Sequence, residues 1–158
     1  VKNERMMRMS DWRDDRIKAA QNGTNPMVMA EMAGGYAVMG DTQFLPGYSV
    51  LLPKRFVTSL NELSLPERVA FLRDMSLLGD AVQAATGAAR INYDILGNTD
   101  AFLHAHVFPR YATEAPERLA KPVWLYSPDH WFADQYAYTV AKDGALRQRI
   151  TAYLQKVN

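Results

Sequence analysis

The sequence contains no cysteine and only three histidines among its 158 residues. The absence of thiols excludes disulfide bonds and any catalysis by a cysteine thiolate. No apolar run approaches the roughly 20 residues that a membrane-spanning helix requires. The net charge is only +1, which gives no electrostatic reason to expect nucleic acid or a membrane surface as a partner.

The remaining composition is that of a globular protein. Hydrophobic residues make up 48% and charged residues 22%, so the chain has enough apolar material for a buried core. Its length predicts a single domain, residues 1–158, with a core at 27–111 and a C-terminal extension at 112–158. The first five residues lead into no hydrophobic signal core, and we therefore expect a cytoplasmic protein.

Periodicity and turn residues predict an alternation of strands and helices. A helix is expected at 12–22, capped by Ser10 or Asp11, and another after the capping box at Ser64, ending at Gly87. The strands are expected at 27–32, 36–41, 48–52, 91–96 and 102–108. This order predicts an α+β fold with a five-stranded antiparallel sheet and its helices packed on one face.

The C-terminal extension gives weaker signals. Residues 112–122 lack periodicity and predict an extended loop, and the apolar run 122–126 is expected to lie across a ligand pocket or a partner subunit. A helix start at 127–129 is expected to gather four aromatic residues mainly for packing: Trp131, Phe132, Tyr136 and Tyr138. A last helix is expected at 145–157, burying Leu146, Ile150 and Leu154.

Two of the three histidines lie in the run 102–108, where His104 and His106 alternate with the apolar residues Leu103, Ala105 and Val107. In a strand, His104 and His106 share one face with Phe102 and Phe108, and the opposite, apolar face is core. Imidazoles about 7 Å apart on one face can both reach a small anion or a metal ion. The polar turn 97–100 directly upstream, rich in N–H groups and carrying a hydroxyl, completes the layout of an active site.

A metal centre is the first alternative for this pair. His-x-His supplies two ligands, but a metal site needs at least a third. His130 and several carboxylates could supply it, but no nearby spacing demands them. Metal-binding cupin barrels place a glycine six residues before the first histidine and a glutamate four or five after the second. Asn98, Arg110 and Tyr111 occupy those positions here. We expect neither a metal nor a cofactor.

The segment 98–110, Asn-Thr-Asp-Ala-Phe-Leu-His-Ala-His-Val-Phe-Pro-Arg, resembles the signature of the histidine-triad family of nucleotide hydrolases and transferases. The segment 39–53, two strand-like runs joined at Pro46-Gly47, resembles the part of that family that lines its nucleoside pocket. Together the resemblance covers roughly residues 27–111. It implies a homodimer in which two five-stranded sheets act together.

The sequence departs from the family at two positions. Phe102 replaces the first histidine, so the chain carries a dyad, and Tyr48 stands where many members have a histidine after Pro-Gly. The resemblance implies that His104 is the nucleophile, oriented by the backbone carbonyl two residues earlier. It places His106 on the phosphate and Thr99 near the leaving group.

Further contacts are expected around this centre. Asn98, Asn92 and the N–H groups near Gly97 are candidates for the phosphate side. Asp41 is either a ribose acceptor or a turn residue satisfied by its own backbone.

The implied function is hydrolysis of a purine nucleotide or dinucleotide at its α-phosphate, with diadenosine polyphosphates or adenylyl conjugates as favoured substrates. A neutral imidazole attacks phosphorus without a separate base. The alternatives are a nucleotidyl transferase of the same family and a non-catalytic purine-nucleotide-binding module. No nucleic acid or membrane partner is expected.

Overall fold

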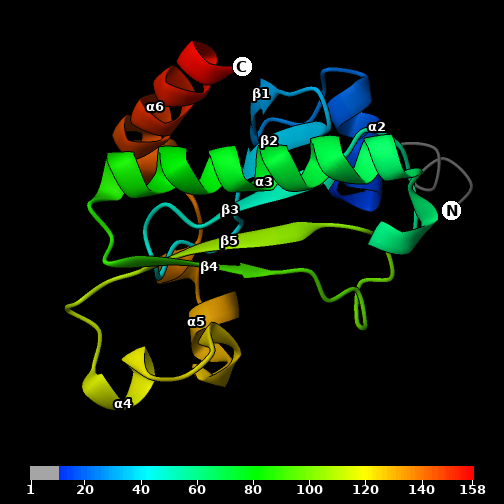
Figure 1. Ribbon diagram of the computed structural model, residues 1–158. Coiled ribbons are helices and arrows are strands. Elements are labelled where there is room, and N and C mark those ends of the chain that lie inside the picture. Colours follow the sequence, from blue (N-terminus) through cyan, green and yellow to red (C-terminus); the bar gives the residue numbers. More distant parts are fainter. Residues whose placement is uncertain (1–10) are drawn as a thin grey trace, which may run out of the picture.

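Five strands form one antiparallel sheet in the order β1-β2-β3-β5-β4 (Figure 1). The computed structural model describes residues 11–158. The strands are β1 (Val28–Glu31), β2 (Gly35–Met39), β3 (Ser49–Pro53), β4 (Arg90–Asp94) and β5 (Ala105–Arg110). Every neighbouring pair is antiparallel. The predicted five-stranded antiparallel sheet is therefore confirmed.

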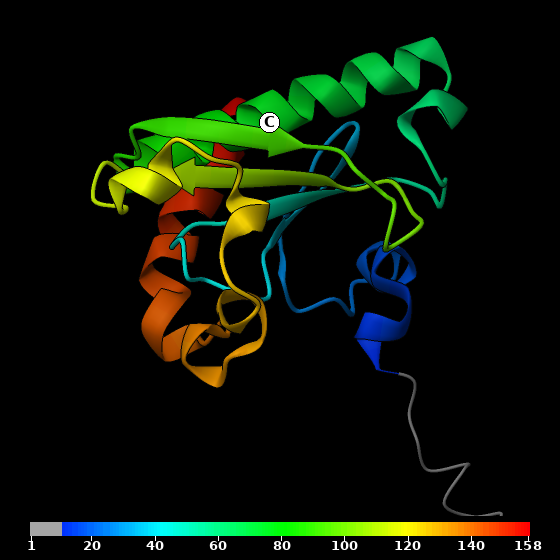
Figure 2. The same cartoon turned by 90° about the horizontal axis from the view of Figure 1, so that it is seen from below.

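Two long helices pack against each other and against one side of the sheet (Figure 1). They are α3 (Leu65–Thr86) and α6 (Val140–Val157). The shorter helical segments are η1 (Trp12–Asp15), α2 (Arg16–Gln21), η2 (Leu60–Glu62), α4 (Pro116–Leu119), η3 (Val123–Leu125), α5 (Asp129–Phe132) and η4 (Asp134–Tyr136). Figure 2 shows α2, in blue, and the yellow to orange segment that contains α5 on the other side of the sheet from α3.

Helix α3 forms for the reasons visible in its sequence. The Ser64 hydroxyl accepts from the Glu67 N–H, and the Glu67 carboxylate accepts from the Ser64 N–H, which completes the predicted capping box. Gly87 ends the helix in the left-handed region, at φ +67°. An apolar stripe of the helix, spaced every three to four residues, faces the sheet, with three members fully buried and two packed at its margin: Phe71, Leu78, Val82, Met75 and Ala85.

Several elements differ in detail from the prediction. The first helix begins with a 3₁₀ turn capped by Asp11, and Ser10 lies outside the described residues. Helix α6 begins at Val140, five residues early, because the Thr139 hydroxyl accepts from the Lys142 N–H and Asp143 accepts from the Thr139 N–H. The expected loop at 112–122 contains the short helix α4.

Strand β5 begins at Ala105 rather than at residue 102, because the backbone at Phe102 turns back to the Asp100 carbonyl. The predicted alternation nevertheless holds across the segment. Leu103, Ala105 and Val107 are at most 1% exposed and belong to the core that includes α3. The two histidines consequently lie on the opposite face of the sheet. Among residues 11–158, no helix has the length and apolar character needed to cross a membrane.

Candidate active site

A cleft of about 1050 Å³ opens on the histidine face of the sheet. Its walls come from segments far apart in the sequence: the η1–α2 segment, the ends of β2 and β3, the turn 97–100 and the η3–α5 segment. Two of these walls, the η1–α2 and η3–α5 segments, lie on the side of the sheet away from α3 in Figure 2. Both histidines of the dyad line this cleft.

His104 is held by its own backbone. Its side chain is buried, and its Nδ1 lies 2.8 Å from the carbonyl oxygen of Phe102. Because a carbonyl oxygen can only accept a hydrogen bond, Nδ1 carries the ring proton. The neutral ring therefore keeps an unprotonated Nε2, which is the nitrogen required of a nucleophile. The structure thus contains the carbonyl contact that the resemblance implied.

His106 has a different partner. Its Nδ1 lies 2.7 Å from the hydroxyl of Tyr48, and the indole of Trp124 packs edge-on against its ring at 4.8 Å. Burial, followed by the neighbouring His104, lowers the pKa of His106 from its ordinary value of 6.5 to about 3. The ring is therefore neutral at pH 7.

The dyad is more compact than the strand pattern predicts. The rings of His104 and His106 are 4.7 Å apart between centroids and meet edge-on. The ring of Phe102 lies 4.6 Å from that of His104 and also lines the cleft. An apolar ring therefore occupies the position next to His104 on its N-terminal side.

The turn before β5 reaches the cleft as predicted. Gly97, Asn98 and Thr99 all line it, and Gly97 has a φ of +78°. The side chains of Asn98 and Thr99 are exposed. They are thus accessible to a ligand bound beside the two imidazoles.

Asp41 also lines the cleft, but neither expectation anticipated its main partner. Its two carboxylate oxygens accept from the two terminal nitrogens of Arg16, at 3.0 Å and 2.6 Å. Arg16 comes from α2, 25 residues earlier in the chain. No spacing in the sequence connects the two residues, and Arg16 was missed for that reason.

Asn92 is not brought to the cleft. Its amide oxygen accepts from Arg110 at 2.8 Å, and the residue lies outside the cleft lining. The physical reason is that Arg110, only 3% exposed, draws polar partners to itself. These include the carboxylate of Glu114 and the carbonyls of Arg118 and Lys121.

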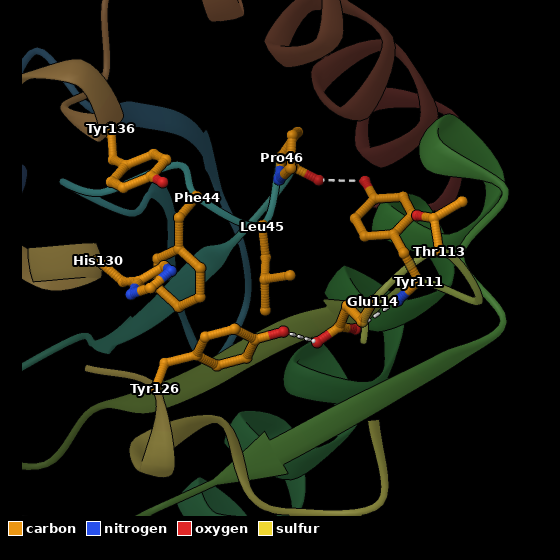
Figure 3. Close-up of a pocket in the computed structure, with 9 residues that line it drawn as sticks. All are labelled: Phe44, Leu45, Pro46, Tyr111, Thr113, Glu114, Tyr126, His130 and Tyr136. Carbon is orange, nitrogen blue, oxygen red and sulfur yellow. Dashed lines mark hydrogen bonds between the residues drawn. The ribbon is translucent and has the colours of Figure 1, made fainter. Parts of the chain in front are cut away.

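Glu114 ties this buried network to a second cavity of about 400 Å³ (Figure 3). Its carboxylate accepts from the Tyr126 hydroxyl at 2.6 Å and from the Tyr111 N–H at 2.7 Å. Burial alone would raise the pKa of Glu114, but these bonds and Arg110 outweigh it and hold the pKa below its ordinary value. Because its hydrogen-bonding capacity is used internally, this carboxylate anchors the loop after β5.

The four aromatic residues expected to gather in the extension lie in different surroundings. Trp131 stacks on Trp124 at 4.9 Å and lines the cleft, while Tyr136 stacks on His130 at the second cavity. Tyr138 packs against the main core. Phe132 is 84% exposed, so its expected packing role is wrong. The apolar run at 122–126 does lie across the cleft, through Trp124 and Tyr126.

Among residues 11–158, the charged side chains that line the cleft are mostly acidic. They are four aspartates and two arginines: Asp14, Asp15, Asp41, Asp100, Arg13 and Arg16. Both arginines are already paired with carboxylates, Arg13 with Asp11 and Arg16 with Asp41. Within residues 11–158, no three histidine, aspartate or glutamate side chains converge in a way that could hold a metal ion.

No protein-family model and no curated protein matches the sequence, but solved structures match the fold. A histidine-triad protein from Sinorhizobium meliloti superposes with a TM-score of 0.70 at 20% identity, covering 94% of this chain and 98% of that one. A hypothetical histidine-triad nucleotide-binding protein from Sulfolobus tokodaii gives 0.67 at 13% identity, with coverages of 89% and 91%.

The diadenosine triphosphate hydrolase of Plasmodium falciparum is a further match, with a TM-score of 0.60 at 13% identity. The match covers 82% of this chain and 77% of the hydrolase. The five-stranded antiparallel sheet with its covering helices is common to these proteins, and this chain has the histidine-triad fold.

Proposed function

We propose that the chain is a nucleotide hydrolase that cleaves at an α-phosphate through a nucleotidyl-His104 intermediate. The observation that carries this proposal is the 2.8 Å contact between His104 Nδ1 and the Phe102 carbonyl, in a ring that lines the cleft. It leaves Nε2 unprotonated without any need for a general base. The likeness of the fold to that of a diadenosine triphosphate hydrolase supports the same reaction class.

The chemistry proceeds in two displacements. In the first, Nε2 of His104 forms a bond to the α-phosphorus while the bond to the leaving group breaks. Thr99 donates a hydrogen bond to the departing atom, and an amine leaving group takes a proton from water as it departs. The Phe102 carbonyl then faces the positive charge that develops on the ring. In the second, water adds to phosphorus, the P–N bond breaks, and the water proton passes to solvent, which regenerates neutral His104.

The charges of the cleft favour a leaving group that carries little negative charge. Within the part of the chain from residue 11 onward, the two arginines that line it are paired, and the aspartates outnumber them. Phe102 adds an apolar surface beside His104. We therefore expect adenylyl conjugates, such as phosphoramidates or adenylyl esters, to be better substrates than long dinucleoside polyphosphates.

Two other functions make use of the same geometry. A nucleotidyl transferase would pass the nucleotide from His104 to phosphate or to a sugar phosphate. A purine-nucleotide-binding module would keep the cleft without turnover, and the replacement of the first histidine by Phe102 is the observation that favours it.

One set of assays separates these functions. The purified chain is given diadenosine tetraphosphate, a fluorogenic adenosine phosphoramidate, or the phosphoramidate with excess inorganic phosphate, and AMP binding is measured by calorimetry. The hydrolase predicts AMP as product with or without phosphate, and the transferase predicts ADP when phosphate is present. Nucleotide binding without either product would contradict the proposal and favour the binding module. His130→Ala, in the second cavity, is the control for loss of a histidine outside the cleft.

We also propose that the chain forms a homodimer. Three apolar side chains of α3 are exposed along one stripe, Leu65, Val69 and Leu72, and Tyr93 is exposed on the edge strand β4. An apolar stripe beside an unpaired strand edge is suited to covering by a second copy. Analytical ultracentrifugation tests this state, and a monomer at micromolar concentration would contradict it.

A further inference from the structure

Tyr48 fills the position after Pro46-Gly47 and is fixed on several sides. Its ring stacks on Phe108 at 4.2 Å with an interplanar angle of 11°. On another side lies Gly40, where an added Cβ would come within 2.2 Å of the Tyr48 ring. The Tyr48 carbonyl accepts from the N–H of Gly40 at 2.9 Å and from the Gln43 amide at 2.9 Å. Ring packing and backbone hydrogen bonds therefore hold Tyr48 in a fixed position.

The hydroxyl of this tyrosine keeps its proton. Burial, followed by the negative charge of Asp41, raises the pKa of Tyr48 well above its ordinary value. Other charges act in both directions, since Arg16 lowers the pKa of Tyr48 and Asp100 and Asp94 raise it. A protonated hydroxyl 2.7 Å from His106 Nδ1 has a proton to donate in that bond.

The two histidines of the dyad consequently face different kinds of partner through the same ring atom. Nδ1 of His104 meets a carbonyl oxygen, which can only accept. Nδ1 of His106 meets a hydroxyl, which can donate. A hydroxyl can also accept, but a Tyr48 hydroxyl that donates to Nδ1 requires the neutral His106 ring to carry its own proton on Nε2. The neutral His104 ring, which donates from Nδ1, instead keeps its lone pair on Nε2.

We infer that Tyr48 is a positioning residue that fixes His106 in its Nε2-protonated neutral tautomer and thereby makes it a hydrogen-bond donor to the phosphoryl oxygens. The identity of the acceptor rests on the proposed function, whereas the tautomer does not. The two imidazoles then have complementary tasks, because one attacks phosphorus while the other stabilises the charge that builds up on its oxygens. Tyr48 fixes the tautomer of His106 through its hydroxyl, which does not itself titrate near neutral pH.

The groups around His106 support a ring whose protonation state, and with it the Nε2–H donor, stays unchanged near pH 7. The titratable groups that face it are Tyr48, the residue before β3, and His104 of its own segment. Asp94 of β4 is opposite it in the sheet register, but its carboxylate accepts from Trp124 Nε1 at 3.1 Å. Trp124, from η3, covers the ring with an uncharged indole.

The tautomer can be read directly in the free protein. With ¹⁵N-labelled histidine, two-bond couplings to the ring carbon protons show which nitrogen bears the proton, and His106→Gln assigns the signals. We expect Nε2–H for His106 and Nδ1–H for His104. A protonated Nδ1 on His106 would overturn the inference, and this reading needs neither a tyrosine variant nor an active enzyme.

Tyr48→Phe removes the hydroxyl and keeps the stacked ring. It should shift His106 toward a mixture of tautomers and lower kcat on the order of 10-fold, with KM nearly unchanged, as expected for one lost orienting hydrogen bond. The matched control is Tyr111→Phe, which loses a hydroxyl bonded to the Pro46 carbonyl at the second cavity (Figure 3). It should leave both the tautomer and kcat unchanged.

The outcomes for the two proposals differ. If Tyr48→Phe leaves the His106 tautomer as it is in the unaltered chain, Tyr48 is not the positioning residue, whatever the activity. If the chain has the expected tautomers but no turnover on any substrate, the proposed hydrolase fails while the positioning by Tyr48 stands. A fall in kcat accompanied by an equal change for Tyr111→Phe would assign the effect to general stability and would also overturn the inference.

Discussion

Both carboxylate oxygens of Asp41 are occupied by the guanidinium of Arg16, at 3.0 Å and 2.6 Å. The pair joins α2 to the chain just beyond β2, at the wall of the cleft. Half of the Asp41 side chain surface remains exposed. The carboxylate is therefore held in a fixed orientation while one side of it still faces the cleft.

Such a carboxylate can accept hydrogen bonds from ribose. We expect Asp41→Ala to weaken ribonucleotide binding about 5- to 10-fold, the size of one ordinary lost hydrogen bond, and to leave 2′-deoxynucleotide binding nearly unchanged. Calorimetry with AMP and 2′-deoxy-AMP measures both. Arg16→Gln is the control, because it breaks the ion pair but keeps the carboxylate, and should retain the ribose preference. An unchanged preference in Asp41→Ala would remove Asp41 from the ribose contact.

Phe102 provides the carbonyl for His104, but its side chain is free to determine the shape of the cleft. Phe102→His should keep the fold and shift the ratio of kcat/KM toward polyphosphate substrates, because a polar ring replaces an apolar one beside the leaving group. Parallel assays with diadenosine tetraphosphate and the phosphoramidate measure that ratio. A chain that is inert until Phe102→His is made would contradict the catalytic account of the natural sequence.

His106 also makes the fold sensitive to acid. Its pKa is about 3 in the folded chain but about 6.5 when unfolded, so between these values the unfolded state binds a proton that the folded state does not. Stability is therefore greatest above pH 6.5 and falls as the pH is lowered toward 3. Urea titrations from pH 7 to pH 4 should show that the free energy of unfolding falls less for His106→Gln than for the unaltered chain. If the free energy of unfolding falls equally with pH in both chains, the fold does not keep the His106 ring neutral.

His106 should contribute more to stabilising the transition state than to nucleotide affinity. If His106 is a preorganised donor, His106→Ala should cost about 2–4 kcal/mol of transition-state stabilisation, seen in kcat. Steady-state kinetics together with AMP affinity distinguish the two effects. A loss of affinity with kcat unchanged would make His106 a ground-state binding residue.

Much of the fold could be predicted because its signals are local. The capping box at Ser64 and the alternation across β5 each depend on residues a few positions apart. The start of α6 was missed because Asp143-Gly144 has the composition of a turn, whereas in the structure Asp143 caps the helix by accepting from the Thr139 N–H. Local composition alone does not separate these two roles.

The candidate site was predictable where the chain itself carries the pattern, as at His104, His106 and the turn 97–100. Contacts between distant segments were not predictable, because no periodicity records them. Arg16 meets Asp41 only once α2 has folded across the end of β2, and Asn92 is held by Arg110 across two paired strands. Trp124 reaches His106 from the extension in the same way.

The role of His104 is tested first by substitution. His104→Ala should lower kcat by about 10⁴ or more while nucleotide binding persists, on the scale of other nucleophile deletions. Stopped assays on the phosphoramidate, with His130→Ala as the matched histidine control, measure the loss. A reduction of only several-fold would place the nucleophile elsewhere.

The stereochemical course at the α-phosphorus tests the covalent intermediate most directly. A substrate made chiral at that phosphorus by sulfur and an oxygen isotope is hydrolysed by the full chain in isotopically labelled water, and the configuration of the product is determined by NMR. Two successive in-line displacements, the first by His104 and the second by water, predict net retention. Net inversion would show that water attacks directly and would contradict the nucleotidyl-histidine account.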